Sequence, residues 1–276
     1  MLEILSFLLL PFLACLIIAG LHCYMGMHIV SREVIFVDLA LAQIAALGGA
    51  VAMLFGYELG DIHAKIFSVA FAIVGAGIFS ISRTDDERVP QEAIIGIVYA
   101  VCAALLIIVL SHAPEGAEHV KELTFGSILT VTWADIYKTA ILYVAIGIFH
   151  FVFRDKFIAL SFDTEHAKKE GISFRIWDFL FYASFGFMVT QSVGIAGVLL
   201  VFSYLIVPAV CAILFTSHLW TRLVLGWILG FIASVVGLTL SVKLDLPAAA
   251  TIVATFGGVL LITAAIRLLV PKTKIA

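Results

Sequence analysis

The sequence has little charge. Only 13% of its 276 residues are Asp, Glu, Lys or Arg, whereas 63% are hydrophobic. Soluble domains usually carry about 25% charged residues, and a water-soluble fold of this size cannot bury so much apolar surface. The excess apolar surface must therefore face lipid. The few basic residues form no stripe of the kind that a nucleic-acid-binding protein needs, so no nucleic-acid partner is expected.

Several motifs of catalytic and metal-binding proteins are also absent. The sequence has no Cys-x-x-Cys spacing, which argues against a zinc knuckle or a disulfide framework. It has no Gly-x-x-x-x-Gly-Lys-Ser/Thr phosphate loop, no His-Glu-x-x-His and no Gly-x-Ser-x-Gly. We therefore expect a protein that is not an enzyme and binds no cofactor of its own. A membrane-embedded enzyme that uses the buried histidines is the less favoured alternative.

What the sequence has instead is a series of long apolar segments. A helix needs about 20 apolar residues to cross the hydrocarbon core, and these segments lack the period-two alternation of strands. The start, Met1-Leu2-Glu3, lacks the positive charge of a cleaved signal peptide, so the first segment is expected to remain as a span. We predict an all-α, polytopic bundle of eight or nine transmembrane helices in a single membrane domain, residues 1–276. The predicted spans are Ile4–Met27, Val34–Phe55, Ile62–Ile81, Gln91–Ser111, Ala134–Phe153, Ile176–Gln191, Gly194–Phe215, Leu223–Val242 and Pro247–Val270.

Two parts of this pattern are irregular. The sixth and seventh spans are barely separated, so one of them is a candidate for a broken or re-entrant helix. The stretch Leu123–Thr132 is too short to span, and we expect it to dip into the membrane or to lie on it.

The basic residues predict the orientation. If the loop Arg154–Arg175 is cytoplasmic, alternation puts twelve of the sixteen Lys and Arg residues inside and leaves Lys65, Lys121, Lys138 and Lys243 outside. Cytoplasmic loops carry an excess of Lys and Arg. The asymmetry favours nine crossings, with the N-terminus outside and the C-terminus inside.

Asp38 and Gln43 are the clearest polar residues within a span. A charged side chain at mid-membrane costs at least about 2.5–3.5 kcal/mol, so each one is a candidate functional residue. Gln43 follows Asp38 by five residues, about 140° around a helix. Either the two line a polar path, or Asp38 caps or pairs near the interface and Gln43 bonds a neighbouring helix. The span is rich in Ala and Gly, which favours a place inside the bundle.

Two regions hold potential metal ligands. His22 and Met25 share a helix face through their i, i+3 spacing. His112 and His119 lie with acidic residues in a predicted outside loop that is suited to gathering a cation. The plainer interpretations are packing residues in the first region and a solvated acidic loop in the second.

Three further residues complete the candidates for a transport path. Glu92 opens the fourth span, where it either faces the path or favours the helix N-terminus. Pro208 removes a backbone donor inside the seventh span and is expected to kink it. Asp245, with Pro247, is interpreted first as a cap and a helix start for the last span.

Six short patterns follow one another along nearly the whole chain. They are Phe36-Val37-Asp38-Leu39-Ala40-Leu41-Ala42-Gln43 with Gly48, then Glu92-Ala93-Ile94-Ile95-Gly96-Ile97, then Leu123-Thr124-Phe125-Gly126-Ser127-Ile128-Leu129-Thr130-Val131-Thr132, then Asp163-x-x-x-Ala167-x-x-x-Gly171, then Gly194-x-x-Gly197-x-Leu199-Leu200 with Leu205-Ile206-Val207-Pro208-Ala209, and last Asp245-x-Pro247. In this order they resemble the membrane permeases of the ABC-3 family, which import zinc, manganese or iron.

The resemblance implies a fold, partners and a location. It implies a type II ABC importer-like permease in the bacterial plasma (inner) membrane, paired with a second permease around a central path. Cytoplasmic ATP-binding cassette ATPases would carry the ATP, and a periplasmic or lipoprotein metal-binding protein would dock outside. The loop at about 154–175, with Asp163, Ala167 and Gly171, would be the element that couples the permease to the ATPase.

One departure from the family pattern concerns the second span. The family's Asp and His are replaced here by Leu39 and Gln43, and Asp38 stands where the family has Gly. Gln offers a neutral oxygen in place of an imidazole. The resemblance therefore leaves the metal unspecified, and a permease for a metal chelate, such as a siderophore or haem, stays an alternative. Such permeases are usually longer, with about ten spans, which argues mildly against that alternative.

Overall fold

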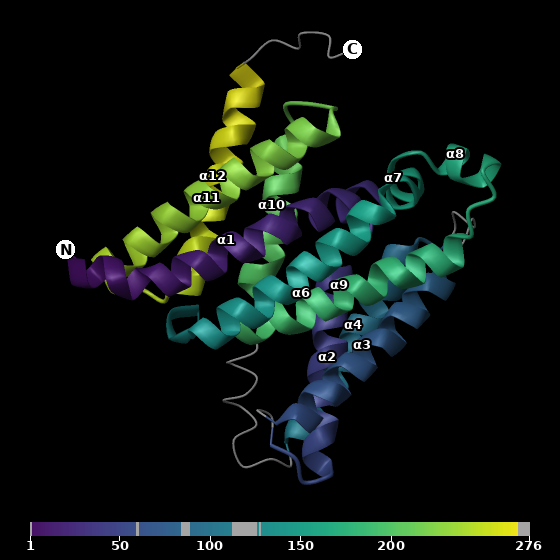
Figure 1. Cartoon of the computed structure of the whole chain (residues 1–276), viewed down its shortest axis with the longest axis horizontal. Helices are drawn as coiled ribbons and strands as arrows, with labels where there is room; N and C mark the ends of the chain where they lie inside the picture. The colour runs from purple at the N-terminus through teal and green to yellow at the C-terminus, as the bar shows by residue number, and fades with distance from the viewer. Residues whose placement is uncertain (1, 59–60, 84–88, 112–125, 127, 270–276) are drawn as a thin grey trace. The chain divides into compact units, whose positions relative to one another are not determined.

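The computed structural model describes the whole chain except residues 1, 59–60, 84–88, 112–125, 127 and 270–276 (Figure 1). The part that it describes is helical and contains no strand. Eight of its helices are long and apolar enough to cross a membrane. These are α1 (Leu2–Ser31), α2 (Val37–Leu54), α3 (Ile62–Ser82), α4 (Gln91–Leu110), α6 (Trp133–Val152), α9 (Phe174–Ala196), α11 (Leu219–Leu244) and α12 (Ala248–Leu269). The predicted all-α bundle of eight or nine spans is confirmed.

Four shorter elements complete the described chain. The apolar helix α10 (Val198–Ile213) has 16 residues, which rise about 24 Å and fall short of a hydrocarbon core about 30 Å thick. The other three are η1 (Ile128–Thr130), α7 (Arg154–Phe162) and α8 (Thr164–Lys169).

The sixth and seventh predicted spans are two helices separated by a single residue. Gly197 has φ 76° and ψ 159°, a backbone conformation that only glycine adopts readily. Gly194, at which the sequence placed the start of the seventh span, lies inside α9 instead. Gly126 packs on this break, where an added Cβ would lie 2.2 Å from the carbonyl carbon of Ala196. The close contact requires glycine and places Gly126 against the end of α9.

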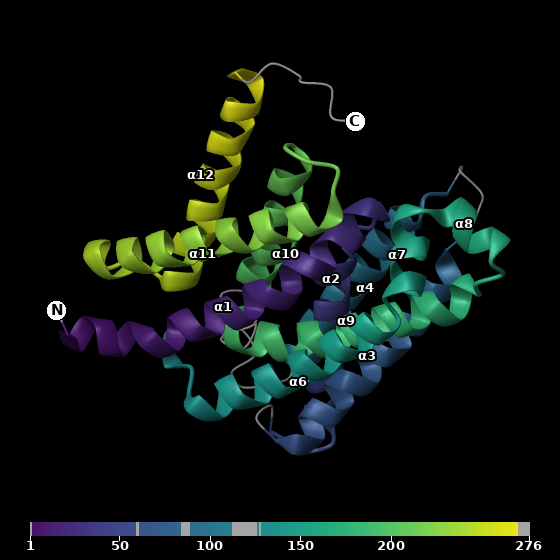
Figure 2. The ribbon, with the colours of Figure 1, turned by 45° about the horizontal axis from the view of Figure 1, so that its top comes forward.

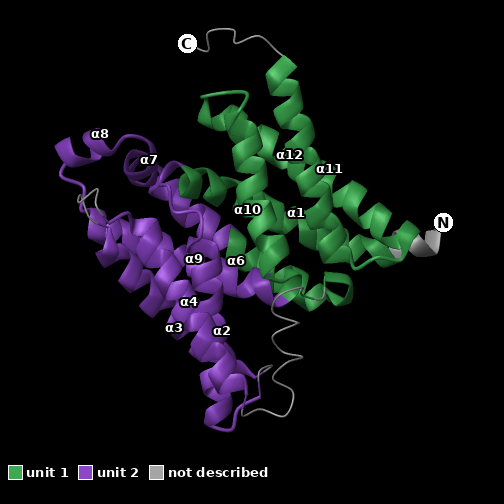
Figure 3. Cartoon of the chain, turned by 180° about the vertical axis from the view of Figure 1, so that it is seen from behind, with its two compact units in different colours: residues 1–30, 125–143, 195–276 green, residues 31–124, 144–194 purple. Residues whose placement is uncertain are grey.

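The chain divides into two compact units, drawn in two colours in Figure 3. Unit 1 comprises residues 1–30, 125–143 and 195–276, and unit 2 comprises residues 31–124 and 144–194. Each unit is assembled from segments that are far apart in the sequence.

In unit 2, α2 packs against α3 and α4 (Figures 1 and 2), and its contact with α3 is made through small residues. A Cβ on Gly48 of α2 would lie 2.6 Å from the carbonyl oxygen of Phe67, and a Cβ on Gly75 of α3 would lie 2.6 Å from Ile44 Cδ1. Helices in lipid gain little from the hydrophobic effect, so close backbone approach and dense packing hold them together. The prediction that the second span lies inside a bundle agrees with its mostly buried residues.

In unit 1, α10, α11 and α12 pack against one another, and α1 packs on α10. Tyr204 is fully buried, lies within 2.5 Å of the Ser234 hydroxyl, and meets the Phe256 ring edge-on. Gly26 of α1 makes the closest approach, because a Cβ there would lie 1.9 Å from the carbonyl oxygen of Leu205. The contact between α1 and α10 therefore depends on the absence of a side chain at residue 26.

This contact predicts a position-specific effect in α1. We expect Gly26→Ala to lower the free energy of unfolding by about 1–3 kcal/mol, because the added methyl group pushes α1 away from α10. Gly20→Ala in the same helix is the matched control, since an added Cβ there meets nothing within 4 Å. It is expected to be neutral or to stabilise by up to about 1 kcal/mol. Both variants are unfolded by heating in detergent, and a thiol-reactive dye that labels the buried cysteines as they become exposed gives the midpoint of unfolding. Equal midpoints for the two variants would contradict the packing described.

Candidate functional site

The α8 segment, defined here as Asp163–Gly171, is a short helix with a defined cap at each end. Asp163 Oδ1 accepts a hydrogen bond from the backbone N–H of His166 at 3.0 Å, as an N-cap does. At the other end Gly171 has φ 65°. Its N–H donates to Lys168 O at 3.2 Å, and the N–H of Ile172 donates to Ala167 O at 3.0 Å. This pair of bonds is the Schellman motif.

Ala167 fixes the α8 segment to its neighbours. Its side chain is fully buried in a cluster with Ala159 and Leu160 of α7. The partly buried side chains that cover this cluster are Ile172, Phe174 and Trp177. The pattern Asp163-x-x-x-Ala167-x-x-x-Gly171 thus has a physical basis, because its three residues supply the N-cap, the buried contact and the left-handed C-terminal residue of one short helix.

A cavity of about 240 Å³ opens beside this segment. Its walls are partly apolar, and its charged lining residues are Asp155 and Lys156 of α7 with Glu170 at the end of α8. The surface around α8 therefore offers both charges and an apolar floor to a binding partner.

A buried charge cluster lies close to the α8 segment. Asp178 of α9 is fully buried, and its carboxylate accepts hydrogen bonds from two arginines. Arg32 Nη1 is 2.8 Å from Asp178 Oδ1, and Arg83 Nη1 is 2.9 Å from Oδ2. The Arg32 side chain is only 3% exposed and packs with its guanidinium 4.0 Å from the centre of the Phe181 ring. A single buried carboxylate therefore joins the turn after α1, the end of α3 and the start of α9.

Asp178 is not among the candidates that the sequence suggests. Arg32 and Arg83 count there only among the twelve basic residues of the predicted cytoplasmic side, which also holds the loop Arg154–Arg175. The contacts of unit 2 are consistent with that topology, because they bring both arginines to Asp178 at the start of α9. The available signal was the position of Asp178 inside a predicted span, since a charge there requires a partner.

Asp38 is buried in the first turn of α2 with 1% of its surface exposed. Neither carboxylate oxygen has a hydrogen-bond partner among the residues that the structure describes. The buried Oε1 of Gln43 also lacks a partner there.

Glu92, in the first turn of α4, accepts a hydrogen bond from the backbone N–H of Phe36 at 2.9 Å, so it caps the start of α2 rather than only its own helix. The second carboxylate oxygen of Glu92, Oε2, is buried and has no hydrogen-bond partner among the described residues.

The predicted ligands His22 and Met25 are both fully buried in α1. His22 Nδ1 is 2.9 Å from the carbonyl oxygen of Ile18, and its ring lies near that of Tyr143. His112 and His119 lie outside the described residues. Across the described residues, no three His, Cys, Asp or Glu side chains come together as a metal site would require.

Pro208 and Asp245 lie in unit 1. Pro208 is buried in α10 and has no N–H to offer the carbonyl of Tyr204, which instead receives the Cys23 thiol at 3.9 Å. Asp245 is exposed, has φ 52° and ends α11, where its N–H donates to Ser241 O. It therefore caps the preceding helix rather than opening the last one, which begins after Pro247.

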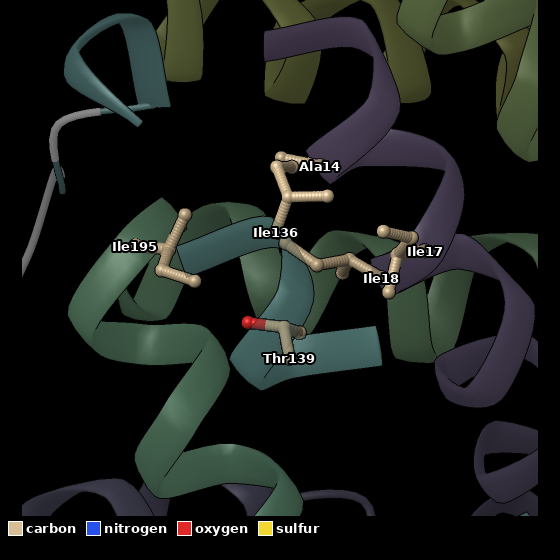
Figure 4. Close-up of a pocket in the computed structure, with 6 residues that line it drawn as sticks. All are labelled: Ala14, Ile17, Ile18, Ile136, Thr139 and Ile195. Atoms are coloured by element: carbon tan, nitrogen blue, oxygen red, sulfur yellow. The ribbon is translucent and has the colours of Figure 1, made fainter. Parts of the chain in front are cut away.

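Figure 4 shows a small pocket in unit 1 between α1, α6 and the end of α9. Thr139 is its one polar lining residue, and the space has no room for a water molecule. Such a gap is a packing defect in an apolar core rather than part of an ion path. Its other lining residues are Ala14, Ile17, Ile18, Ile136 and Ile195.

Comparison with known proteins identifies a family whose members resemble this chain. The sequence pattern of the ABC 3 transport family matches residues 5–267. A probable metal transport system membrane protein of Chlamydia trachomatis is 25% identical over 237 residues, which cover 84% of this chain and 80% of the relative. The manganese transport system membrane protein MntC of Listeria innocua is 26% identical over 228 residues, covering 83% and 79%.

A solved structure has a similar fold. The structure of PsaBC from Streptococcus pneumoniae in complex with Fab aligns with a TM-score of 0.75 and 24% identity, covering 93% of this chain and 90% of the matched chain. At this identity the likeness concerns the fold, which is shared along almost the whole chain.

The cap of α8 predicts how the segment responds to substitution. A residue with a Cβ raises the energy of the left-handed backbone conformation by about 1–2 kcal/mol, and a β-branched residue adopts this conformation least readily. We expect Gly171→Val to speed hydrogen–deuterium exchange in the peptide covering α8 by about 5–30-fold. Gly171→Asn is the matched control, because Asn tolerates this conformation. Equal exchange in the two variants would contradict a cap that depends on the conformation of residue 171.

Proposed function

The chain belongs to the ABC-3 transport family, and on that premise we propose that it is the membrane-spanning permease of an ATP-driven importer for divalent metal ions. The observation that carries the proposal is the family match over residues 5–267 of a chain with 276 residues. The names of relatives support the cargo, since one is a manganese transport protein and another a probable metal transport protein.

We propose three kinds of protein partner. A cytoplasmic ATP-binding cassette ATPase would hold and hydrolyse the ATP, because this sequence has no phosphate loop. It would dock on the α8 segment, whose capped helix and charged cavity provide a rigid surface. A metal-binding protein would deliver the ion from outside, and a second copy of the permease would complete the path. Lipid of a bacterial plasma membrane would surround the apolar faces.

The polar side chains of α2 and of the start of α4 support a path for a hard cation. Asp38, Gln43 and Glu92 each carry a buried oxygen without a hydrogen-bond partner in the described chain. Carboxylate and amide oxygens suit Mn²⁺, whereas imidazole and thiolate ligands suit Zn²⁺ better. Because Gln43 stands where the family has His, we infer that the path favours manganese over zinc. A metal chelate is the second candidate cargo, and the unusual residue at position 43 is the observation that favours it.

Accumulation of metals tests the function directly. Cells with and without this gene are compared for uptake of a panel of metals, including manganese, iron and zinc, over minutes. We expect uptake of manganese or iron to depend on the gene and on the gene for its ATPase. Unchanged accumulation of every free metal, with loss of a chelated one, would replace the proposed cargo by a metal chelate.

Asp38 is expected to matter for transport. Asp38→Asn keeps the size of the side chain and removes its charge, so we expect the initial rate of metal uptake to fall by about tenfold or more, which corresponds to about 1.4 kcal/mol. His166→Ala is the comparison: it changes a residue of the proposed docking surface without altering the caps of α8, and we expect it to lower the rate less than Asp38→Asn does. Uptake is normalised to the amount of permease in the membrane. Equal losses in the two variants, or a larger loss in His166→Ala, would remove Asp38 from the path.

A further inference from the structure

The residues that flank the α8 segment on either side contact the same charge cluster. Ser161 lies in the last turn of α7, just before the segment, and its hydroxyl accepts a hydrogen bond from Arg32 Nε at 2.7 Å. Phe174 is the first residue of α9, just after the segment, and the Arg83 guanidinium lies 4.6 Å from the centre of its ring. Asp178 joins the two arginines. The residues immediately before and after the α8 segment are therefore held by the contacts of one charge cluster.

The other side of the cluster leads to α2. Arg32 lies in the turn before α2 and is six residues from Asp38. Arg83 directly follows α3, which packs along α2 through the close contacts at Gly48 and Gly75. The cluster thus lies between the α8 segment and the helix that carries Asp38 and Gln43.

We propose that the Arg32–Asp178–Arg83 cluster is a positioning device that transmits displacement of the α8 segment to α2, with Ser161 as its contact on α7. The inference rests on the proposed function, because the cluster has this role only in a transporter that is driven through the α8 segment.

The geometry of Arg32 suits such a link. Its guanidinium is planar, so the bond from Nε to Ser161 and the bond from Nη1 to Asp178 keep a fixed angle to each other. The side chain is almost fully buried, and little water is present to screen or replace these bonds. Movement of Ser161 must therefore move Arg32 or break a buried bond.

The decisive measurement is the amount of metal moved per ATP hydrolysed. The whole complex of permease and ATPase is reconstituted in vesicles with its metal-binding protein, and uptake of manganese, iron and zinc is measured together with phosphate release. We expect Ser161→Ala to preserve ATP hydrolysis and to lower the metal moved per ATP by about fivefold or more, a size typical of coupling between sites. A role in stability alone would lower both rates together and leave their ratio unchanged.

Two further variants make the test specific. Ser80→Ala is the matched control, because Ser80 is also buried in unit 2 and donates to the carbonyl of Gly77 in its own helix. It is expected to keep the wild-type ratio. Arg32→Lys keeps the charge but cannot bond Ser161 and Asp178 in the same fixed geometry. If the two substitutions act through the same hydrogen bond, the double variant Ser161→Ala with Arg32→Lys moves as much metal per ATP as Arg32→Lys alone.

The outcomes separate the two proposals. A wild-type complex that shows no ATP-dependent uptake of any of the three metals would overturn the proposed function and this inference with it. A wild-type complex that transports, with Ser161→Ala and Arg32→Lys at the wild-type ratio, would overturn the inference alone.

Discussion

A lipid bilayer offers no hydrogen-bond partner, so a polar group within it is costly unless the protein itself supplies a partner. This constraint accounts for several contacts at helix ends. The first two residues of α4 serve two other helices, because Gln91 Nε2 donates to Phe79 O near the end of α3 and Glu92 accepts from Phe36 N at the start of α2. Asp178 meets the same requirement for charge by joining two arginines. The polar contacts therefore fix which helix ends lie together, while apolar packing holds the helices side by side.

The helices could be predicted from the sequence because length and hydropathy alone decide what can cross a membrane. The predicted spans differ from the helices by only a few residues at most ends. The break between α9 and α10 was misplaced, at Gly194 instead of Gly197. Both glycines are compatible with a break, and the choice depends on the contact with Gly126, which lies about 70 residues earlier and leaves no local signal. Asp245 was assigned to the wrong helix end for a similar reason, since its left-handed backbone makes it the end of α11.

The sequence singled out the α8 residues only through the family resemblance, and it could not bring the distant residues of the charge cluster together. Asp163, Ala167 and Gly171 lie within nine residues, and their spacing corresponds to a cap, a buried face and a helix end. The charge cluster joins residues that are 146 and 95 positions apart. A single sequence shows that a buried Asp needs a partner, but it does not show which of sixteen basic residues provides it. The partner is known only when the folded chain is available.

The caps of α8 have a consequence for binding. A helix of six residues is too short to persist in water by itself, yet Asp163, Ala167 and Gly171 hold this one in shape before any other protein arrives. An ordered surface loses less conformational entropy on association than a flexible loop does. The α8 segment is thus preorganised, and the conformational entropy of ordering it is lost during folding rather than in any later association.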